Sequence, residues 1–436
     1  MRLENLKFIF LSSEKYPPFR VDTTVLFGEE LTSRGHEIVW LLQSGSSCDR
    51  AYKANWNGQV VWVGETDQGI ERFNRLRKHV LNIIHKLKLF KLLKESRYDF
   101  IQVKDEYIMA LAAALGARIY RTKFIFWLSY PHAEESLFKV REGVARYPVF
   151  YFIRGHFLKF ITYKIIMRLA SHVFVQSEQM KKDLTIEGVP ISKMTPVPMG
   201  VSLKDFERYR IVEKISGNNK RRKKIVYLGT LQSARKMDFM VRVLNIVLKS
   251  EPDALLYFVG DGDDRGDRET IEKAAEDLGL SESIVITGFI PRADAMRYVR
   301  EADVCVSPFF PDPILNSTSP TKIIEYMAME KPVVANEHPE QRLLIVESGG
   351  GICVPYDEAA FAEAIVELLM DAVKAKEMGW RGRKYVEENR DYKKIADVVE
   401  GKYFELFSES KCQVDATSVS DSKMSDKLDN DRRNSE

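Results

Sequence analysis

Short runs of consecutive apolar residues recur along this chain, and they limit its fold more than any other feature. Clear examples are residues 7–11 (KFIFL), 123–128 (KFIFWL), 225–228 (IVYL) and 255–259 (LLYFV). A strand that is apolar at every position is buried on both faces, which is typical of parallel sheets covered by helices. Helical patterns separate the runs, so we expect an α/β fold with two tandem series of strands.

The length of 436 residues exceeds what one hydrophobic core normally serves, so we expect two domains. We place the first domain at residues 1–203 and the second at residues 204–391. The polar and charged residues 202–222 are expected to form the linker between them. Residues 409–436 are rich in Ser, Asp and Lys and poor in large apolar residues, so we expect a disordered tail.

Composition narrows the classes of function. Hydrophobic residues make up 45% and charged residues 30% of the chain, as in soluble globular proteins. The formal net charge of +3 implies no overall field for a polyanion, and we recognise no nucleic-acid-binding motif, so nucleic acid is not expected as a partner. The four cysteines lack metal-binding spacing, and no apolar run reaches about 18 residues. With no apolar signal segment at the N-terminus, we expect a cytoplasmic protein, at most peripheral on the inner face of the membrane.

Chemical information is concentrated in residues 302–336. The pattern is a short apolar strand, a loop rich in Pro, Ser and Asn, a helix that begins after Pro320, and a second apolar strand. The free amides and the dipole of a helix N-terminus favour a phosphate, and Lys322 adds a positive charge in the first turn. The carboxylate of Glu325 suits sugar hydroxyls, which donate hydrogen bonds to it. Taken alone, the pattern also fits an ordinary α/β unit with a capped helix.

Residues 319–328 read Ser-Pro-Thr-Lys-Ile-Ile-Glu-Tyr-Met-Ala. Through this signature the chain resembles the group 1 (family 4) nucleotide-sugar-dependent glycosyltransferases. Residues 177–184 (S-E-x-M-K-x-x-L) and 198–201 (P-x-G-V) resemble the end of that family's first domain. The resemblance implies the GT-B fold, in which two Rossmann-like domains face a cleft.

The resemblance also implies a division of labour between the domains. Residues 1–203 would hold the acceptor, and residues 204–391 would bind the nucleotide sugar. A last helix, residues 392–408, would cross back and pack on the first domain. Consistency between the signature and the two series of strands strengthens this interpretation.

Most of the donor site falls, by resemblance, in the second domain. Amides near Thr321 would hold the donor diphosphate, and Glu325 would bind the nucleotide ribose. Arg235 and Lys236 would act as a catalytic clamp on the leaving group. The family often has a second Glu at the place of Ser317, eight residues before Glu325. The further donor-binding residues that the resemblance indicates are Gly229, Thr230, Gly260, Gly262, Phe289, Ser317, Ser319 and Lys322.

Two loops of the first domain carry candidate residues as well. His132 follows the strand of residues 123–128, and ligands of open α/β sheets gather beyond the carboxyl ends of strands. By resemblance this His contacts the donor sugar near the reaction centre; a capping or surface His is the alternative. In the first loop the family usually has a Gly-Gly pair, where this chain has Phe19 and Arg20. The fork of Arg20 could hold a phosphate or carboxylate on the acceptor side, or simply lie at the surface.

No metal or cofactor is expected. Asp261 and Asp263 form a D-x-D string that could suggest a divalent cation. We interpret it instead as the turn after a strand of the second domain, with solvated acids. Arg235, Lys236 and the helix N-terminus at Thr321 would stabilise the leaving diphosphate without metal.

Residues 70–95 and 144–168 are strongly basic, and the second stretch is interleaved with aromatic residues. Such a mixture suits an anionic membrane surface. The alternative, a helical hairpin whose aromatics pack inside the first domain, is equally compatible with the pattern.

The resemblance therefore implies an enzyme, a retaining glycosyltransferase that moves a sugar from a nucleotide-diphosphate sugar to a hydroxyl acceptor. We expect that acceptor to be a lipid-linked or glycan intermediate of polysaccharide or glycoconjugate synthesis. Two alternatives remain open at this point. One is a nucleotide-sugar 2-epimerase of the same fold, and the other is a catalytically inactive, membrane-associated binding module.

Overall fold

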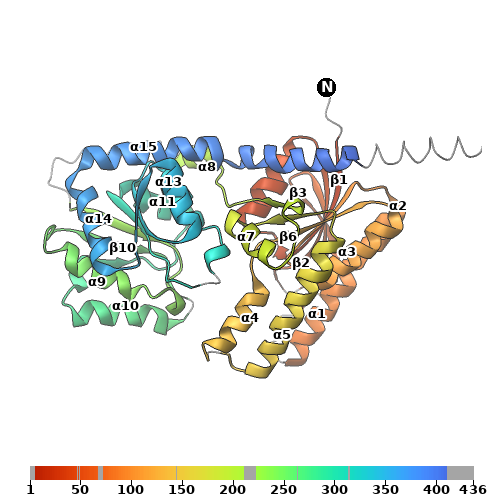
Figure 1. Ribbon diagram of the computed structural model, residues 1–436, viewed down its shortest axis with the longest axis horizontal. Coiled ribbons are helices and arrows are strands. Elements are labelled where there is room, and N and C mark those ends of the chain that lie inside the picture. Colours follow the sequence, from red (N-terminus) through yellow and green to blue (C-terminus); the bar gives the residue numbers. More distant parts are fainter. Residues whose placement is uncertain are drawn as a thin grey trace, which may run out of the picture.

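The computed structural model describes residues 5–46, 48, 50–66, 72–143, 145–210, 222–262, 264–312 and 315–409. Asp263, residues 211–221 of the expected linker and residues 410–436 of the expected tail lie outside the described residues. The chain forms two α/β units, each built on its own sheet (Figure 1). Two sheets with helices on their faces confirm the fold class expected from the sequence.

The first sheet is parallel except at one edge. Its strand order is β3 (Tyr52–Trp56), β4 (Gln59–Gly64), β2 (Glu37–Ser44), β1 (Lys7–Tyr16), β5 (Phe100–Lys104), β6 (Lys123–Leu128), β7 (His172–Val175) and β8 (Met194–Pro196). Only β3 pairs antiparallel, with β4. The central strands are buried on both faces, as their continuous apolar runs require.

Helices cover both faces of this sheet. They are η1 (Asp22–Leu31), which has π-type hydrogen bonding, α1 (Arg72–Lys86), α2 (Lys88–Glu95), α3 (Tyr107–Tyr120), α4 (His132–Arg141), α5 (Pro148–Phe160), η2 (Ile161–Ile166), α6 (Met167–Leu169), α7 (Glu178–Ile186) and η3 (Ile191–Lys193). Helices α1, α4 and α5 project from the sheet on one side of the molecule (Figure 1).

The second sheet is parallel throughout. Its strand order is β11 (Ile284–Ile286), β10 (Leu255–Val259), β9 (Lys224–Leu228), β12 (Val304–Ser307), β13 (Val333–Asn336) and β14 (Gly351–Val354). Its helices are α8 (Leu203–Arg210), η4 (Ser233–Arg235), α9 (Asp238–Val247), α10 (Arg265–Asp277), η5 (Ser281–Ser283), α11 (Arg292–Glu301), η6 (Leu315–Ser317), α12 (Thr321–Ala328), α13 (Pro339–Ser348), α14 (Glu358–Met370) and α15 (Ala372–Asn389).

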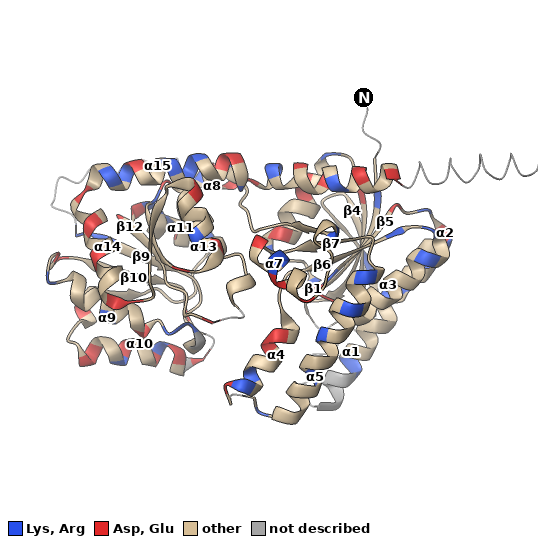
Figure 2. Cartoon of the chain, in the orientation of Figure 1, with Lys and Arg blue, Asp and Glu red and all other residues tan. Residues whose placement is uncertain are grey.

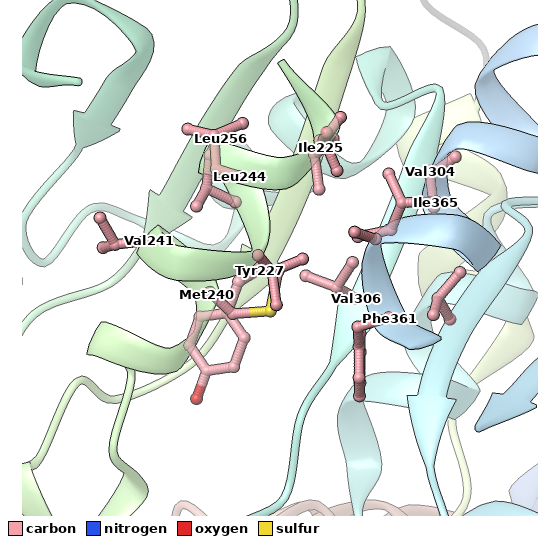
Figure 3. Close-up of a cluster of buried hydrophobic side chains, with 14 of the residues drawn as sticks. Ile225, Tyr227, Met240, Val241, Leu244, Leu256, Val304, Val306, Phe361 and Ile365 are labelled. Carbon is pink, nitrogen blue, oxygen red and sulfur yellow. The ribbon is translucent and has the colours of Figure 1, made fainter. Parts of the chain in front are cut away.

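The core of the second unit joins its central strands to α9 and α14. Ile225 and Val304 from the sheet, Leu244 from α9 and Ile365 from α14 belong to one buried cluster (Figure 3). Close packing of these apolar side chains fixes the sheet against its helices and so fixes the loops at the carboxyl ends of β9, β10 and β12. Those loops carry the candidate donor-binding residues.

A last helix, residues 392–409, lies along the first unit although α15 belongs to the second (Figure 1). Its Tyr403 is fully buried, and the ring centroid lies 4.8 Å from that of Phe8 and 4.9 Å from that of Phe100. The Tyr403 hydroxyl donates to Gln102 Oε1 at 2.8 Å. These contacts fasten the end of the described chain to the first sheet.

Three details differ from the sequence-based expectations. The edge strand β3 was not predicted, because its burial is too slight to give a strong pattern. The expected linker begins as the helix α8, whose Phe206 is buried. Lys86, one of the basic residues that make the stretch 70–95 suit an anionic surface, is fully buried; its ammonium pairs with Glu106 and donates to the carbonyl of Ser12 at 2.6 Å.

The aromatic residues of the stretch 144–168 also differ from one expectation. The alternative in which they pack inside the first domain is wrong for most of them. Only Tyr163 is buried, whereas five others are more than half exposed: Tyr147, Phe150, Phe152, Phe157 and Phe160. The helix α5 therefore presents an apolar surface to solvent.

We predict that Tyr403→Ala will lower the free energy of unfolding by about 3–5 kcal/mol, because it leaves a cavity among aromatic rings. Tyr403→Phe should cost only about 0.5–1.5 kcal/mol, since it removes one hydrogen bond. Equilibrium unfolding in urea measures both. Val398→Ala, at an exposed position of the same helix, serves as control. Equal stability of Tyr403→Ala and the control would show that the last helix does not hold the first unit together.

Candidate functional site

Two glycine turns meet where β9 and β10 end. A Cβ on Gly260 would lie 2.1 Å from the carbonyl oxygen of Gly229, closer than any real contact. Gly229 and Gly260 have φ angles of 142° and 144°, which side chains rarely adopt. Only glycine fits at both places, so the two turns can pack directly against each other.

The N-terminus of α12 opens next to these turns. Among the described residues, no side chain caps the helix, whose first residue is Thr321. The second residue, Lys322, turns inward and is buried, with its Nζ 4.0 Å from the centroid of the Tyr227 ring. A Cβ on Gly229 would lie 3.2 Å from this Nζ. Lys322 therefore points from α12 directly at the glycine turn.

Lys322 is a buried basic group that no anion hydrogen-bonds among the described residues. Its Nζ has no hydrogen-bond partner among the described residues. Burial, together with the charge of Arg235, lowers the pKa of the Lys322 ammonium well below its usual value. The face of Tyr227 offsets this only partly, because a cation–π contact is weaker than an ion pair. A bound dianion would satisfy the ammonium and restore its charge.

The sequence-based pair Arg235 and Lys236 separates in the structure. Arg235 Nε donates to Thr230 Oγ1 at 2.9 Å, and its guanidinium lies 5.9 Å from the centroid of the Phe309 ring. Lys236 is exposed, and its backbone is left-handed with a φ of 53°. The structure thus brings Arg235 together with Lys322, and leaves Lys236 at the surface.

The remaining donor-side candidates surround this cluster. Glu325 forms a 2.8 Å ion pair with Arg292, at the start of α11. Phe289 is exposed and could offer a flat apolar surface. A Cβ on Gly262 would collide with Asp267 at 2.3 Å, so this glycine permits packing against α10.

On the first unit, His132 begins α4 at the carboxyl end of β6. Its ring packs edge-on against Tyr130, with centroids 4.9 Å apart. The imidazole, whose Nδ1 is 3.9 Å from the Glu135 carboxylate, and the neighbouring Lys139 lower the pKa of Glu135 to about 2. Burial raises the pKa of Tyr130 to about 12, with contributions from Glu135 and from Asp312 of the second unit. The loop after β6 therefore faces the loop after β12.

Arg20 lies in the first loop, and its guanidinium is already engaged. It donates to both oxygens of Asp22, from Nε at 3.2 Å and from Nη2 at 2.9 Å. Lys104 lies 2.8 Å from the same carboxylate and 3.2 Å from Glu14. Although burial opposes it, Lys104 and Arg20 hold the pKa of Asp22 below its usual range. Arg20 thus holds a carboxylate of its own chain.

Ser317 and Ser319 contact the first unit. The Ser317 hydroxyl donates to Asp183 Oδ2 at 2.6 Å, and its carbonyl accepts from Ser177 Oγ at 2.7 Å. The Ser319 hydroxyl accepts from the amide of Met199 at 3.0 Å. Where the resemblance leads us to expect a second Glu, the nearby carboxylate comes instead from α7.

A cavity of ≈ 480 Å³ opens between α4, α5, α7 and η6. Its walls are mostly apolar, with Leu137, Met180 and Leu184 among them, and an ion pair of Lys159 with Glu187 (2.7 Å) stands at its border. Tyr163 donates to the Glu134 carboxylate, whose pKa burial raises. The volume lies within the range of about 300–1,000 Å³ that is usual for ligand pockets.

The arrangement can bind a diphosphate. Lys322, Arg235 and an uncapped helix N-terminus converge beside the two glycine turns, and each of these three favours an anion. Within the described part of the chain, no three His, Cys, Asp or Glu side chains are grouped to hold a metal ion.

Sequence reasoning missed Asp183, Tyr227 and Arg292. Asp183 occupies a variable position of the S-E-x-M-K-x-x-L pattern, and its partner Ser317 is 134 residues away. No local signal could reveal such a pair. Arg292 directly follows a Gly-Phe-Ile-Pro turn and begins a helix. The sequence could therefore have indicated that it lies near the binding loops.

Comparison with known sequences places both units in described families. A sequence family described as "Glycosyl transferases group 1" matches residues 222–371, and one described as "Glycosyltransferase Family 4" matches residues 23–205. The alpha-monoglucosyldiacylglycerol synthase of Streptococcus pneumoniae is 24% identical over 65% of this chain and 62% of its own length. A GDP-mannose-dependent phosphatidylinositol monomannoside mannosyltransferase of Mycolicibacterium smegmatis is 27% identical over 41% of this chain and 48% of its own. The matched segments thus span about half to three-fifths of these two relatives.

Solved structures share the whole fold. A sucrose-phosphate synthase from Thermosynechococcus elongatus superposes over 93% of this chain and 100% of its own, with a TM-score of 0.67 and 18% identity. The Anabaena protein HepE, solved with UDP, covers 92% of this chain and 100% of its own, with a TM-score of 0.62 and 14% identity.

We predict that Lys322 titrates below all exposed lysines in the free protein, because burial and Arg235 disfavour its charge. Inorganic sulfate should raise that pKa, since a dianion favours the ammonium; anion binding therefore weakens as pH rises. NMR of ¹³C-lysine-labelled protein follows the titration, and Lys322→Gln identifies the resonance. A single common pKa near ~10.4, unchanged by sulfate, would contradict the assignment of Lys322 to an anion site.

Proposed function

Because this chain belongs to the group 1 glycosyltransferases, we propose that it transfers a sugar from a nucleotide-diphosphate sugar to a hydroxyl acceptor, with retention of the anomeric configuration. The observation that carries the proposal is the buried Lys322, which lacks a partner among the described residues and lies beside Arg235 and the α12 N-terminus. Such a cluster of positive groups suits the diphosphate of a nucleotide sugar. UDP bound to HepE, a protein of the same fold, supports this class of donor.

The proposed chemistry follows from the charge that develops on the leaving group. The bond between the anomeric carbon and the distal phosphate oxygen breaks, the acceptor oxygen bonds to that carbon, and the hydroxyl proton passes to an oxygen of the departing phosphate. Negative charge grows on the phosphate, and Arg235, Lys322 and the amides at Thr321 stabilise it most at that moment. In this scheme His132, beyond the carboxyl end of β6, would contact the transferred sugar.

The other donor contacts follow from the same arrangement. Glu325 would exchange its ion pair with Arg292 for the ribose hydroxyls, and Phe289 would flank the base. No step in this scheme uses a metal, so turnover should persist in excess chelator. If a chelator abolished turnover and Mg²⁺ or Mn²⁺ restored it, Asp261 would instead become a candidate metal ligand.

Two alternatives can be tested in the same assay. A nucleotide-sugar 2-epimerase would convert the donor without acceptor, and an inactive module would bind the donor without turnover. The curated relatives named above are a synthase and a mannosyltransferase, which favours transfer. A thermal-shift screen of nucleotide sugars identifies the donor, because a ligand that binds only the folded state raises the melting temperature. Product analysis with and without acceptor then separates the three activities.

We extend the proposal to the acceptor, a lipid-linked or glycan intermediate reached at the inner face of a membrane. The helix α5 and its N-cap residue Tyr147 carry seven large apolar side chains that are 51% to 74% exposed: Tyr147, Val149, Phe150, Phe152, Ile153, Phe157 and Phe160. An apolar surface of this density marks an interaction site. In Figure 2 most of α5 carries no charge.

Neighbouring helices enlarge this surface. Ile84 of α1 and Ile108, Leu115 and Ile119 of α3 are also more than half exposed. Exposed basic residues accompany them: Lys91, Lys94, Arg154, Lys164 and Arg168. Each basic side chain near an anionic surface contributes about 1 kcal/mol. No helix in the described part of the chain is long and apolar enough to cross a bilayer.

The cavity between α4, α5, α7 and η6 is the space we propose for the acceptor. From α5 it is lined by Lys159, and its border includes η6, which leads to α12. The names of two relatives specify lipids, a monoglucosyldiacylglycerol that one of them makes and a phosphatidylinositol monomannoside on which the other acts. An acceptor with an apolar chain fits both the cavity walls and the exposed helix.

We predict that Arg235→Ala lowers kcat by about 10²-fold or more, as the loss of one group that stabilises developing charge commonly does. Lys236→Ala should change kcat much less, because Lys236 is exposed. Steady-state kinetics with the donor found in the screen measures both. Equal losses in the two variants would restore the sequence-based pair as the clamp, and full activity in Arg235→Ala would remove the clamp role from it.

We predict that the double variant Phe150→Ser, Phe157→Ser binds anionic vesicles at least ~10-fold more weakly, since each buried phenyl ring contributes about 1.5–3 kcal/mol. High salt should release the wild type in part by screening the basic residues. Vesicle sedimentation measures binding, and Val373→Ser, at an exposed apolar site of α15, is the matched control. If wild type, double variant and control sediment alike, the α5 surface is not a membrane contact.

A further inference from the structure

The loop between β12 and α12 is held from both units of the molecule. From the first unit, Ser177 Oγ donates to the Ser317 carbonyl at 2.7 Å and Asp183 Oδ2 accepts from the Ser317 hydroxyl at 2.6 Å. From the second unit, His338 Nε2 donates to the Leu315 carbonyl at 2.7 Å. The hydroxyl and the carbonyl of Ser317 are therefore both hydrogen-bonded to α7, through Asp183 and the N-cap residue Ser177.

This loop leads directly into the phosphate-binding helix. Only three residues separate Ser317 from Thr321, the first residue of α12, and Lys322 follows. Between them, Ser319 accepts from the Met199 amide at 3.0 Å, which is a further contact from the segment after β8. The start of α12 is thus fixed in part by residues of the first unit.

We propose that Asp183 is a positioning residue of the transfer reaction: its hydrogen bond with Ser317 docks the donor loop on the first unit and so sets the α12 N-terminus and Lys322. The proposal rests on the transferase function proposed above. Asp183 and Ser317 both line the cavity proposed for the acceptor, and in this scheme Asp183 acts through Ser317.

Asp183 is better suited to this role than Ser177. Its bond with Ser317 has an ionised acceptor, and such bonds are shorter and about twice as strong as neutral ones. The other carboxylate oxygen, Oδ1, accepts from Gln179 Nε2 at 2.7 Å, one turn earlier in α7. The Asp183 carboxylate is therefore oriented by its own helix, independently of Ser317. Ser177 also caps α7 by accepting from the Met180 amide at 3.0 Å, so its substitution would disturb the helix itself.

The bonds to Ser317 exist only while the two units lie together. If the units separate, Ser317 and Asp183 both lose their partner and the loop is held by the second unit alone. The precise placement of Lys322 would then depend on closure of the molecule, whereas the second unit alone would still hold much of the nucleotide. Loss of Asp183 is therefore expected to lower kcat while leaving nucleotide affinity nearly unchanged.

The test is a double-mutant cycle of Asp183→Ala and Ser317→Ala in the full chain. We expect each single variant to lower kcat about tenfold, which is the loss of one hydrogen bond to a charged group, and the double variant to be no worse than either. The Kd for UDP and the KM for the acceptor should stay within about twofold. Asp183→Asn keeps an acceptor at the same place and should recover part of kcat.

Hydrogen exchange with UDP and without acceptor gives a second readout. Residues 315–324 should exchange faster in both single variants than in the wild type, because the loop has lost its anchor. Thr185→Ala is the matched control, since this exposed hydroxyl bonds only within α7, to the Lys181 carbonyl at 2.7 Å. It should match the wild type in kcat and in exchange.

The proposal is overturned if kcat of the single variants equals that of the control, if the two losses multiply in the double variant, or if only the acceptor KM changes. The last result would make Asp183 an acceptor-binding residue instead. Absence of transfer by the wild type with every donor of the screen would overturn the proposed function, whereas full transfer by Asp183→Ala would overturn only this inference.

Discussion

A buried positive charge without a partner is the constraint on which the site depends. Burying an ammonium away from water costs free energy unless an anion compensates it. Near Lys322 lie the rings of Tyr227 and Phe309 and the charges of Arg235 and Glu325, but its Nζ has no hydrogen-bond partner among the described residues. The second sheet imposes this situation by packing α12 beside the glycine turn at Gly229. Binding of the diphosphate in the proposed reaction would relieve the penalty, so the fold would prepare the site for the leaving group.

Contacts between the two units also fix the position of this site. The first unit supplies Ser177, Asp183 and Met199 to the loop that precedes α12, and the last helix returns to the first sheet through Tyr403. Both connections join parts of the chain that are far apart in sequence. The position of the phosphate-binding helix is therefore a property of the two units together.

The same packing leaves one helix without a covering element. Gly155 of α5 packs against Leu137 of α4, where an added Cβ would lie 2.6 Å from Leu137 Cδ2, while the opposite, aromatic side of α5 faces solvent. Hydrophobicity alone does not tell whether such a side chain lies in a core or at an interface. This is why the pattern of residues 144–168 was compatible with both interpretations.

The sequence by itself determined the class of fold and much of the donor loop. Continuous apolar strands require sheets covered on both faces, and Pro320 with Thr321 marks a helix start, so these features follow from local chemistry. Tertiary structure alone decided that Lys322 rather than Lys236 faces Arg235, that Lys86 is buried, and that Asp183 meets Ser317. The physical reason is that the burial and pairing of a polar side chain depend on neighbours brought close only by packing, and no local pattern encodes them.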